Sequence, residues 1–505
     1  MQKATPVTVV PKAAYDPLDE YDLNHPKYKG GKKFPKCKNL KKQASKPSTK
    51  AKYPKTIKVH VANSKDADHF AKLIQRSLSA DPKALRITFS AKYDADTRSI
   101  VITKRDRESA WGFKDKSRRV PRARIRKSHN TDDFFRRHWL DMPPFDQEGD
   151  PPWITFYVTF KTESDFECFA RLVKQRQIIG AAPKAIWFPF KEPASYTKEW
   201  WISEDGKPNQ PRYPIFIPSK GRAHEQMTMR TLSRMGLKYY VMVEPQEYMT
   251  YRRLLPPEAT ILSLPEGNHG NGPGVARNAC WDYAKDTLKA KRFFVLDDNI
   301  DGFYRLHENK RYRCGDGTPF RVLEDFADRY ANVPLAGFQY RFFKPSNTKH
   351  YPITVNTRIY SAALVSTEDE RFKQRGRYNE DTIQSIDVMK AGLCTVEFNC
   401  FLSGKLRTQV MKGGNSDEFY TPQGKRSRAK STRAKSQMLV NVHSDVCEPT
   451  SAYGREHHKC HYTVFQKNQL KRTAAWIEKL KRHGRKPWSI DPYEMKLVPI
   501  PKRGG

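Results

Sequence analysis

The feature that most restricts the fold of this chain is an alternation of strand-like and helical segments that begins at residue 211. Four short apolar segments have the composition of strands, and helical or glycine-rich stretches separate them; they are 213–222, 238–245, 259–265 and 292–299. Such alternation predicts an α/β fold with a mostly parallel, helix-covered sheet. Ligands of such sheets bind beyond the carboxyl ends of the strands, so polar residues at those ends become candidate site residues.

The fourth segment, FFVLDDN, places three polar residues directly after a buried strand. Asp297, Asp298 and Asn299 follow four apolar residues. Two acids at a strand end are costly unless a cation neutralises them, and oxygen ligands of this kind suit Mg²⁺ or Mn²⁺. We therefore predict a divalent metal site here, with a helix cap or a salt-bridged turn as the alternative.

A glycine-rich loop and the helix after it, GNHGNGPGVARNACWDYA at 267–284, form the second candidate. Gly272 and Gly274 allow backbone amides to approach an anion, and the start of a helix favours negative charge. Arg277 and Asn278, in the first turns, could reach a diphosphate or a base. We predict donor binding by this loop, although the glycines alone would also fit a plain flexible loop.

A third motif, RYNEDT at 377–382, places two acids before a helix with buried apolar positions. We predict that Glu380 or Asp381 acts as a general base on an acceptor hydroxyl, with helix capping as the alternative. A metal ion, a diphosphate cradle and a separate base together describe transfer from a nucleotide-activated donor. The metal would stabilise the leaving diphosphate.

The order of motifs from about 211 to 468 resembles the TET-associated glycosyltransferases of bacteriophages, a branch of the GT-A nucleotide-sugar transferases. The matching segments are IPSKGR, GNGPGVARN, FFVLDDN, NTRIYS, RYNEDT, FLSGKLRTQVMKGGNSDEFY and GREHHKCHY. The family is similar to the glucosyltransferase that completes base J, and its members are expected to glycosylate hydroxymethylated pyrimidines in DNA, often made by a companion TET/JBP dioxygenase. The resemblance implies a GT-A-like fold, a UDP-sugar or related donor, Mn²⁺ or Mg²⁺, and 5-hydroxymethylcytosine or a related base in phage DNA as acceptor.

The resemblance also implies roles for individual residues. Asp297 and Asn299 would be the outer members of a DxD-like metal motif, in which Asn at the third position lowers the ligand charge. Asp298 would hold the donor ribose or sugar. Asp381 would be the base, aided by Glu380. Further nucleotide contacts would come from the ends of the first two strands, at Lys220, Arg222 and Glu244.

A late histidine commonly completes the metal shell of GT-A enzymes, and HHKCH at 457–461 offers one. On a strand, His457 and His458 would face opposite ways, so only one can serve, and we assign His458. A structural histidine is the alternative. A zinc cluster is disfavoured, because one strand cannot bring all of these side chains together.

Two further segments are candidates for acceptor binding. Residues 356, 358 and 360 would share one face of a predicted strand, for which packing is the alternative role. MKGGN at 411–415 ends a strand, and its glycines indicate close approach to a ligand or a mobile lid. The predicted acceptor contacts are Asn356, Arg358, Lys412, Gly413, Gly414 and Asn415.

Composition divides the rest of the chain. Residues 1–56 contain fourteen lysines and four acids, which predicts a disordered basic arm. Residues 57–200 hold a β-α-β pattern that repeats after 99 positions, with FAKLI at 70–74 and FARLV at 169–173, which predicts a small α+β module. We expect the transferase domain at 201–423, a basic linker at 424–436, the C-terminal part of the domain at 437–468 and a basic tail at 469–505.

The charge of the chain predicts a polyanionic partner. Lysine and arginine total 93 against 55 acids, a formal net charge of +38, which favours nucleic acid first and an acidic membrane surface second. The basic arm and the stretch 114–129 would contact phosphates with little sequence preference. A base within a duplex would have to be flipped out, presented in a single strand or reached through the major groove.

Other classes of protein fit less well. No apolar run approaches the ~18 residues of a membrane span, and the N-terminus lacks the apolar core of a signal peptide. Eight scattered cysteines without a CxxC pair favour a reducing compartment, here the cytoplasm of the phage-infected host. Alternatives are a sugar transferase acting on protein or another polymer, and a degenerate DNA-binding structural protein. A nuclease could also use clustered acids with Mg²⁺, but the glycine-rich loop and the separate acid pair fit it less well.

Overall fold

The computed structural model describes residues 55–74, 86–94, 99–102, 132–149, 152–179, 183–190, 199–203, 209–267, 272–405, 425–452, 455–484, 486–489 and 491–500. The chain forms two compact units. The smaller consists of Gln43–Arg126 and Asp150–Tyr196, and the larger of Met1–Lys42, Lys127–Gly149 and Thr197–Gly505. The predicted basic arm up to residue 54 and the basic stretch 114–129 lie outside the described residues.

The smaller unit contains two β-α-β segments in one sheet of order β2-β5-β1-β6. Its elements are β1 (Thr56–Val61), α1 (Ser64–Leu73), β2 (Arg86–Phe89), the hairpin β3 (Ala91–Asp94) and β4 (Ser99–Ile102), β5 (Ile154–Phe160), α3 (Glu163–Leu172) and β6 (Ala185–Phe188). Strands β1 and β5 pair antiparallel at the centre, and β2 and β6 each pair in parallel with the first strand of the other segment. This exchange gives the sheet an approximate two-fold symmetry.

The two segments build their helices in the same way. Asn63 caps α1 by accepting from the backbone N–H of Asp66, and Thr162 caps α3 in a reciprocal capping box with Asp165. Phe70 and the equivalent Phe169 are fully buried in the common core, with ring centroids 6.3 Å apart. The 99-residue sequence repeat thus corresponds to a repeat in structure.

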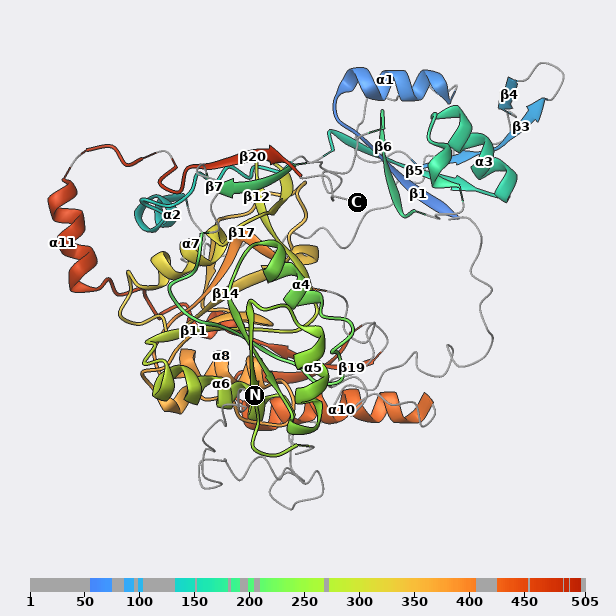
Figure 1. Cartoon of the computed structure of the whole chain (residues 1–505). Helices are drawn as coiled ribbons and strands as arrows, with labels where there is room; N and C mark the ends of the chain where they lie inside the picture. Colours follow the sequence, from blue (N-terminus) through green and yellow to red (C-terminus); the bar gives the residue numbers. More distant parts are fainter. Residues whose placement is uncertain are drawn as a thin grey trace. The chain divides into compact units, whose positions relative to one another are not determined.

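The larger unit is built on a twelve-stranded sheet of order β10-β9-β8-β11-β16-β14-β17-β12-β13-β7-β20, with β15 paired to β17 (Figure 1). The strands are β7 (Glu199–Ser203), β8 (Ile215–Pro218), β9 (Tyr239–Val243), β10 (Ala259–Ser263), β11 (Arg292–Leu296), β12 (Ile300–His307), β13 (Lys310–Cys314), β14 (Leu335–Tyr340), β15 (Ile353–Val355), β16 (Ala362–Ser366), β17 (Thr395–Lys405) and β20 (Met495–Pro499). The four strands predicted from the sequence are confirmed as β8, β9, β10 and β11.

The sheet is mixed, which corrects the prediction of a mostly parallel sheet. Strands β10, β9, β8 and β11 are parallel, because a helix or a long loop carries the chain back between them. From β11 onward, antiparallel pairs predominate. Strands β12 and β13 are joined only by Glu308 and Asn309, both in the left-handed region, and such a two-residue turn forces antiparallel pairing.

Helices cover both faces of the sheet. On β8, Ile215 and Ile217 point into one core and Phe216 into the other, as the period of two requires. The first core receives α2 (Asp132–His138), α4 (Met227–Arg234) and α7 (Thr318–Ala327), and the second receives α6 (Gly274–Asp282) and α8 (Glu380–Lys390). Helix α5 (Tyr248–Leu254) follows β9.

The C-terminal segments differ from their predicted roles. Most of the expected linker forms the first part of helix α10 (Lys425–Val442), whose apolar end packs with the β18–β19 hairpin (Cys447–Ala452 and Arg455–Cys460) and α8. The expected tail contains helix α11 (Ala474–His483) and β20, which pairs antiparallel with β7 (Figure 1). Met495 of β20 is buried in the main core, so this strand is part of the folded unit. None of the described helices combines the length and hydropathy that crossing a membrane requires.

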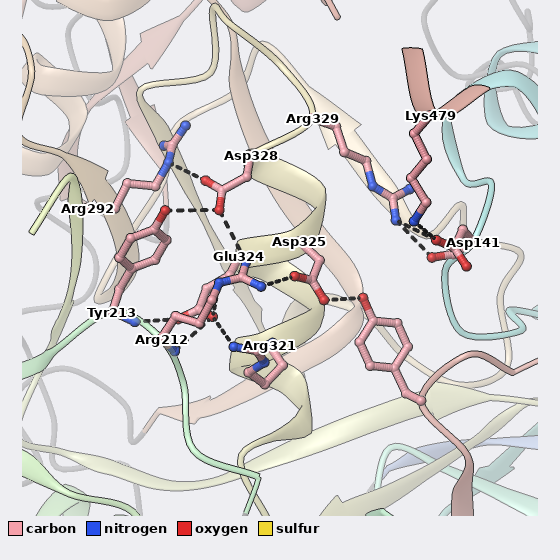
Figure 2. Close-up of polar contacts among 11 residues, drawn as sticks. Asp141, Arg212, Tyr213, Arg292, Arg321, Glu324, Asp325, Asp328, Arg329 and Lys479 are labelled. Carbon is pink, nitrogen blue, oxygen red and sulfur yellow. Dashed lines mark hydrogen bonds and ion pairs between the residues drawn. The ribbon is translucent and has the colours of Figure 1, made fainter. Parts of the chain in front are cut away.

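Polar contacts around α7 fix the chain just before β8 (Figure 2). The buried carboxylate of Glu324 accepts from the backbone N–H groups of Arg212, at 3.0 Å, and Tyr213, at 2.9 Å. The Arg212 side chain in turn pairs with Asp325 and with Asp328, the latter at 3.2 Å. Burial raises the pKa of Glu324 to about 7, although the two N–H donors and Arg212 oppose the shift.

Candidate active site

Strand polarity gathers polar residues at one edge of the large sheet. The parallel strands β8, β9, β11, β14 and β17 all end there, and the antiparallel strands β16 and β12 begin there. The residues at this edge are Ser219, Glu244, Asp297, Tyr340, Ser361 and Lys405. This is the carboxyl edge at which α/β sheets bind their ligands.

Asp297 is the centre of this edge. Its Oδ1 accepts from the guanidinium of Arg277 at 2.5 Å, and its Oδ2 accepts from the Ser361 hydroxyl at 2.6 Å and from the Lys405 ammonium. Burial would raise the pKa of Asp297, but the charges of Lys405 and Arg277 and the hydrogen bonds outweigh it and hold that pKa well below its usual value. Asp297 is therefore ionised throughout the physiological range.

Backbone strain positions the Ser361 side chain. Ser361 has a φ of +51°, in the left-handed region that non-glycine residues rarely adopt. Its Oγ contacts the Tyr340 hydroxyl at 2.5 Å as well as Asp297, and its carbonyl accepts from the Asp297 N–H at 2.7 Å. The turn thus locks the orientation of the Asp297 carboxylate.

Asp298 faces the end of β8. Ser219 donates to its Oδ2 at 2.8 Å, and the Arg222 guanidinium donates to its Oδ1. The Tyr251 hydroxyl joins this group, with its oxygen 2.7 Å from Ser219 Oγ. Burial raises the pKa of Asp298, and Arg222 and Ser219 oppose that shift.

The remaining predicted nucleotide contacts form a neighbouring pair. Lys220 Nζ donates to Glu244 Oε1 at 2.8 Å, which joins the ends of β8 and β9. Glu247 lies beside them and accepts from the N–H of Gly221 at 2.6 Å. The structure therefore brings Lys220, Arg222, Glu244 and Asp298 to adjacent strand ends.

Glu380 and Asp381 begin α8 and face the same centre. Asn379 before them has a φ of +53°, and Asp381 Oδ1 accepts from the N–H of Thr382 at 2.7 Å. Burial and the charge of Asp381 raise the pKa of Glu380 to about 7, while Arg277 opposes the shift. Burial likewise raises the pKa of Asp381, although the charges of Arg277 and Lys405 oppose this shift. The two carboxyls therefore titrate as a pair.

Part of the glycine-rich loop has a structural role. Gly272 has a φ of +81°, and a Cβ there would lie 2.4 Å from the carbonyl oxygen of Arg377. Asn278 exchanges two hydrogen bonds with the backbone of Gln374, at 2.7 and 2.8 Å. Gly274 also packs against Gln374. These contacts join α6 to the segment before α8, and Arg277 projects from α6 to the acids.

The predicted metal ligands are only partly brought together. Within the described residues, no group of three or more His, Cys, Asp or Glu side chains could hold a metal ion. Asn299 Oδ1 is nevertheless buried without a hydrogen-bond partner among those residues. Magnesium-type sites commonly use one or two protein oxygens plus substrate phosphates. The residues therefore fit an ion that Asn299 holds together with a phosphorylated ligand, and do not fit a protein cage.

His458 lies on β19, next to a second histidine. The rings of His457 and His458 have centroids 4.7 Å apart, whereas neighbouring side chains of an ideal strand point to opposite faces. The backbone N–H of His458 donates to His457 Nδ1 at 2.9 Å, which holds the His457 ring beside the backbone. Burial and the charges of His457 and Arg358 lower the pKa of His458 to about 3, so it is neutral. The structure gives it no contact with Asp297 or Asn299.

The predicted strand through residues 356–360 is wrong. Strand β15 ends at Val355, and Asn356 turns the chain with a φ of +60°. The Asn356 amide donates to the carbonyls of Phe465 and Asn468, at 3.0 and 2.9 Å, which is a structural role. Arg358 lies over the ring of Tyr360, 4.8 Å from its centroid. The other predicted acceptor residues, Lys412, Gly413, Gly414 and Asn415, lie outside the described residues.

Sequence reasoning missed three residues of the centre: Ser361, Lys405 and Tyr340. The first two stand inside the motifs NTRIYS and FLSGK, but neither type of residue signals a site by itself. Ser361 and Lys405 reach Asp297 through strand register. Leu296 pairs with Ala362, which follows Ser361, and Ile300 pairs with Lys405 itself.

Residues 213–414 match the family model of the TET-associated glycosyltransferases, as the motifs predicted. Among solved structures, the chain is similar to glucosyl-3-phosphoglycerate synthase from Mycobacterium tuberculosis in complex with Mn²⁺, uridine diphosphate and phosphoglyceric acid. The two sequences are 11% identical, the match covers 50% of this chain and 86% of that chain, and the TM-score is 0.29. It is also similar to the apo-form glycosyltransferase GlyE of Streptococcus pneumoniae TIGR4. The identity is 15%, the match covers 42% of this chain and 43% of that chain, and the TM-score is 0.19. None of the curated proteins matches the sequence.

Proposed function

We propose that this protein transfers a sugar from a nucleotide-sugar to the hydroxyl of a hydroxymethylated pyrimidine in DNA, because residues 213–414 match the family model of the TET-associated glycosyltransferases. The donor is a UDP-sugar, and the acceptor base is 5-hydroxymethylcytosine or a relative, made by a companion dioxygenase. The observation that carries the proposal is the carboxyl pair Glu380–Asp381, with raised pKa values, directly beside Arg277 and Asp297.

The pair supplies the general base. A base works best when its pKa lies near the working pH, and Glu380 is raised to about 7. Glu380 and Asp381 titrate as a pair, and the carboxyl that has lost its proton can accept the proton of the acceptor hydroxyl. We assign Asp381 as that base and Glu380 as its coupled partner.

The cations of the site hold the donor. Arg222, Arg277 and Lys405 face the four acids of the centre, which are Asp297, Asp298, Glu380 and Asp381. The three cations therefore do not outnumber the four acids. A diphosphate adds negative charge, so further positive charge is required.

Mn²⁺ or Mg²⁺, predicted from the sequence, would provide that charge. Asn299, whose Oδ1 is buried without a partner among the described residues, is the ligand we assign to it. The ion would stabilise the negative charge of the leaving diphosphate. The assignment of His458 as a further ligand stays a prediction.

DNA as the acceptor is supported by the charge of the chain. A net charge of +38 favours binding of a polyanion, whereas a small acceptor would not require so much positive charge. An acceptor in protein or in another polymer is the alternative. Transfer to modified DNA distinguishes the two.

The test incubates the protein with 5-hydroxymethylcytosine DNA, Mn²⁺ and a panel of UDP-sugars, followed by mass analysis of the digested nucleosides. We expect a hexose mass on the modified base with at least one donor. Two reactions are the controls: unmodified DNA of the same sequence with the wild-type protein, and modified DNA with the Asp381→Asn protein. The nucleosides should gain no mass in either reaction. No mass increase with any donor on the modified DNA would overturn the proposal.

A further inference from the structure

The turn after β14 exposes two neighbouring aromatic rings close to the acidic centre. Phe342 and Phe343 lie in a short 3₁₀ helix (Arg341–Phe343), and 52% and 47% of their surfaces are exposed. A contiguous exposed apolar patch is a candidate site for a ligand or partner. Their ring centroids lie 4.3 Å apart, so they form one continuous apolar surface.

This surface is linked to the site through stacked rings. The Tyr340 ring lies 5.3 Å from that of Phe342, 5.8 Å from that of Phe343 and 5.7 Å from that of Tyr360, the last two in stacked orientation. The Tyr340 hydroxyl contacts Ser361, which donates to Asp297. A group bound on the two phenylalanines therefore lies one aromatic residue away from the centre.

Several cations lie near the aromatic turn. Lys405 lies 5.5 Å from the centroid of Tyr340, and Arg341 lies over the ring of Tyr304 at 4.2 Å. Arg311 donates to the carbonyl of Arg341 at 2.9 Å, and Lys344 follows directly in the sequence. Aromatic rings bordered by cations are how proteins bind unpaired nucleic acid strands, since bases stack on the rings and phosphates meet the charges.

We propose that Phe342 and Phe343 form a stacking platform for the bases of an unpaired acceptor strand. The inference rests on the proposed function, because it identifies how the acceptor reaches Asp381. A duplex keeps its bases stacked on each other and cannot use the platform, so the enzyme takes its acceptor as a single strand or as a locally opened duplex. The platform holds the bases next to the modified one while that base enters the site.

The test measures binding of an unmodified 12-nucleotide single strand that carries 2-aminopurine, without sugar donor. Stacking on an aromatic ring contributes about 1–3 kcal/mol per base, so Phe342→Ala/Phe343→Ala should weaken binding about tenfold or more and reduce the quenching of 2-aminopurine. Phe342→Leu/Phe343→Leu keeps apolar surface without aromatic rings and should lose binding similarly. Phe342→Tyr/Phe343→Tyr should retain both affinity and quenching.

Matched controls separate a local effect from a folding defect. Phe190 of the smaller unit is 54% exposed, and Phe190→Ala should leave strand binding unchanged. Thermal unfolding and UDP binding should be the same in all variants. Wild-type affinity and quenching in the Ala double variant would overturn the inference, as would an equal loss of duplex binding.

The outcome is independent of the transferase assay. If sugar transfer to DNA fails but the variants lose strand binding as expected, only the proposed function is wrong. If sugar transfer occurs but the Ala double variant binds the strand normally, only the platform is wrong.

Discussion

Lys405 donates a hydrogen bond to the carboxylate of Asp297, although 108 positions separate the two residues. The contact follows from strand register, because β12 begins three residues after Asp297 and its first residue, Ile300, pairs with Lys405 at the end of β17. Together with Arg277, Lys405 keeps Asp297 ionised in a site where 80% of its side chain is shielded. The pairing of β12 with β17 thus brings the two residues together as an ion pair.

Lys405→Met should lower turnover about tenfold or more, because it removes one of the two cations at Asp297 and one positive charge facing the donor. The pKa of Asp297 should rise toward its usual value. Steady-state rates at saturating donor test this expectation. Lys349→Met is the control, since Lys349 pairs with Glu148 at the surface and its loss should leave turnover unchanged. Equal turnover in both variants would contradict the role of Lys405.

Asp381→Asn should abolish turnover and leave donor affinity within about threefold, because a base acts on the acceptor and contributes little to donor binding. Calorimetric titration with UDP and a rate assay measure the two effects. Asp387→Asn is the matched control on the same helix, where Asp387 pairs with Arg375 at 3.0 Å. That variant should lose some stability but remain active. Loss of both binding and turnover in Asp381→Asn would mean that the residue is structural.

The rate should rise with pH through about 7, because a carboxyl of the acid pair must lose its proton before it can accept the proton of the acceptor hydroxyl. Glu380→Gln removes one carboxyl of the coupled pair, and because the repulsion between the two is reciprocal, Asp381 should then lose its proton at a lower pH and the acidic limb should move to lower pH. Profiles of kcat/KM between pH 5 and 9 for both proteins provide the measurement. An unshifted limb in the variant would show that another group controls the rate.

The local patterns of the sequence predicted the first half of the site. Alternating apolar runs located β8 to β11, and the polar residues after them, including Asp297 and Asp298, do lie at one edge. The start of α8 at Glu380 was also readable, because two acids precede a run of apolar positions. These features depend on neighbours in the chain, so one sequence contains the necessary information.

The second half of the site depends on long-range pairing. Tyr340, Ser361 and Lys405 reach the centre because β14, β16 and β17 insert between β11 and β12 in the sheet, and no local pattern encodes that order. The left-handed conformations of Asn356 and Ser361 are set by tertiary contacts, which is why a strand was predicted wrongly at 356–360. Asn278 looked like a ligand residue, yet its amide bonds the backbone of Gln374.

UDP binding should be weak without divalent ions and should strengthen with Mn²⁺, because the described cations of the site do not outnumber its acids before the diphosphate arrives. Titration of metal-free protein with UDP, with and without Mn²⁺, measures this. Asn299→Ala should reduce the gain from Mn²⁺ while leaving the weak metal-free binding unchanged. Equal affinity under both conditions would mean that side chains supply all of the positive charge.

Glu324→Ala should lower the free energy of unfolding by about 2 kcal/mol or more, because the backbone N–H groups of Arg212 and Tyr213 lose their buried acceptor. Glu324→Gln should cost less, since its amide oxygen still accepts one of them. The folded pKa of about 7 lies above that of the unfolded chain, so stability from protonated Glu324 is complete below about pH 4.5 and is lost as the pH rises through 7.

Thermal unfolding at pH 5 and pH 8 tests both parts of this expectation. The melting temperature should fall between the two pH values by a smaller amount in Glu324→Gln than in the wild type, because the variant has no proton to lose at this position. Activity at low temperature should be nearly normal in both variants, since Glu324 on α7 binds the backbone just before the start of β8, whereas Asp298 accepts from Ser219 after the other end of that strand. A pH response identical to that of the wild type would show that Glu324 is ionised in the folded protein across this range.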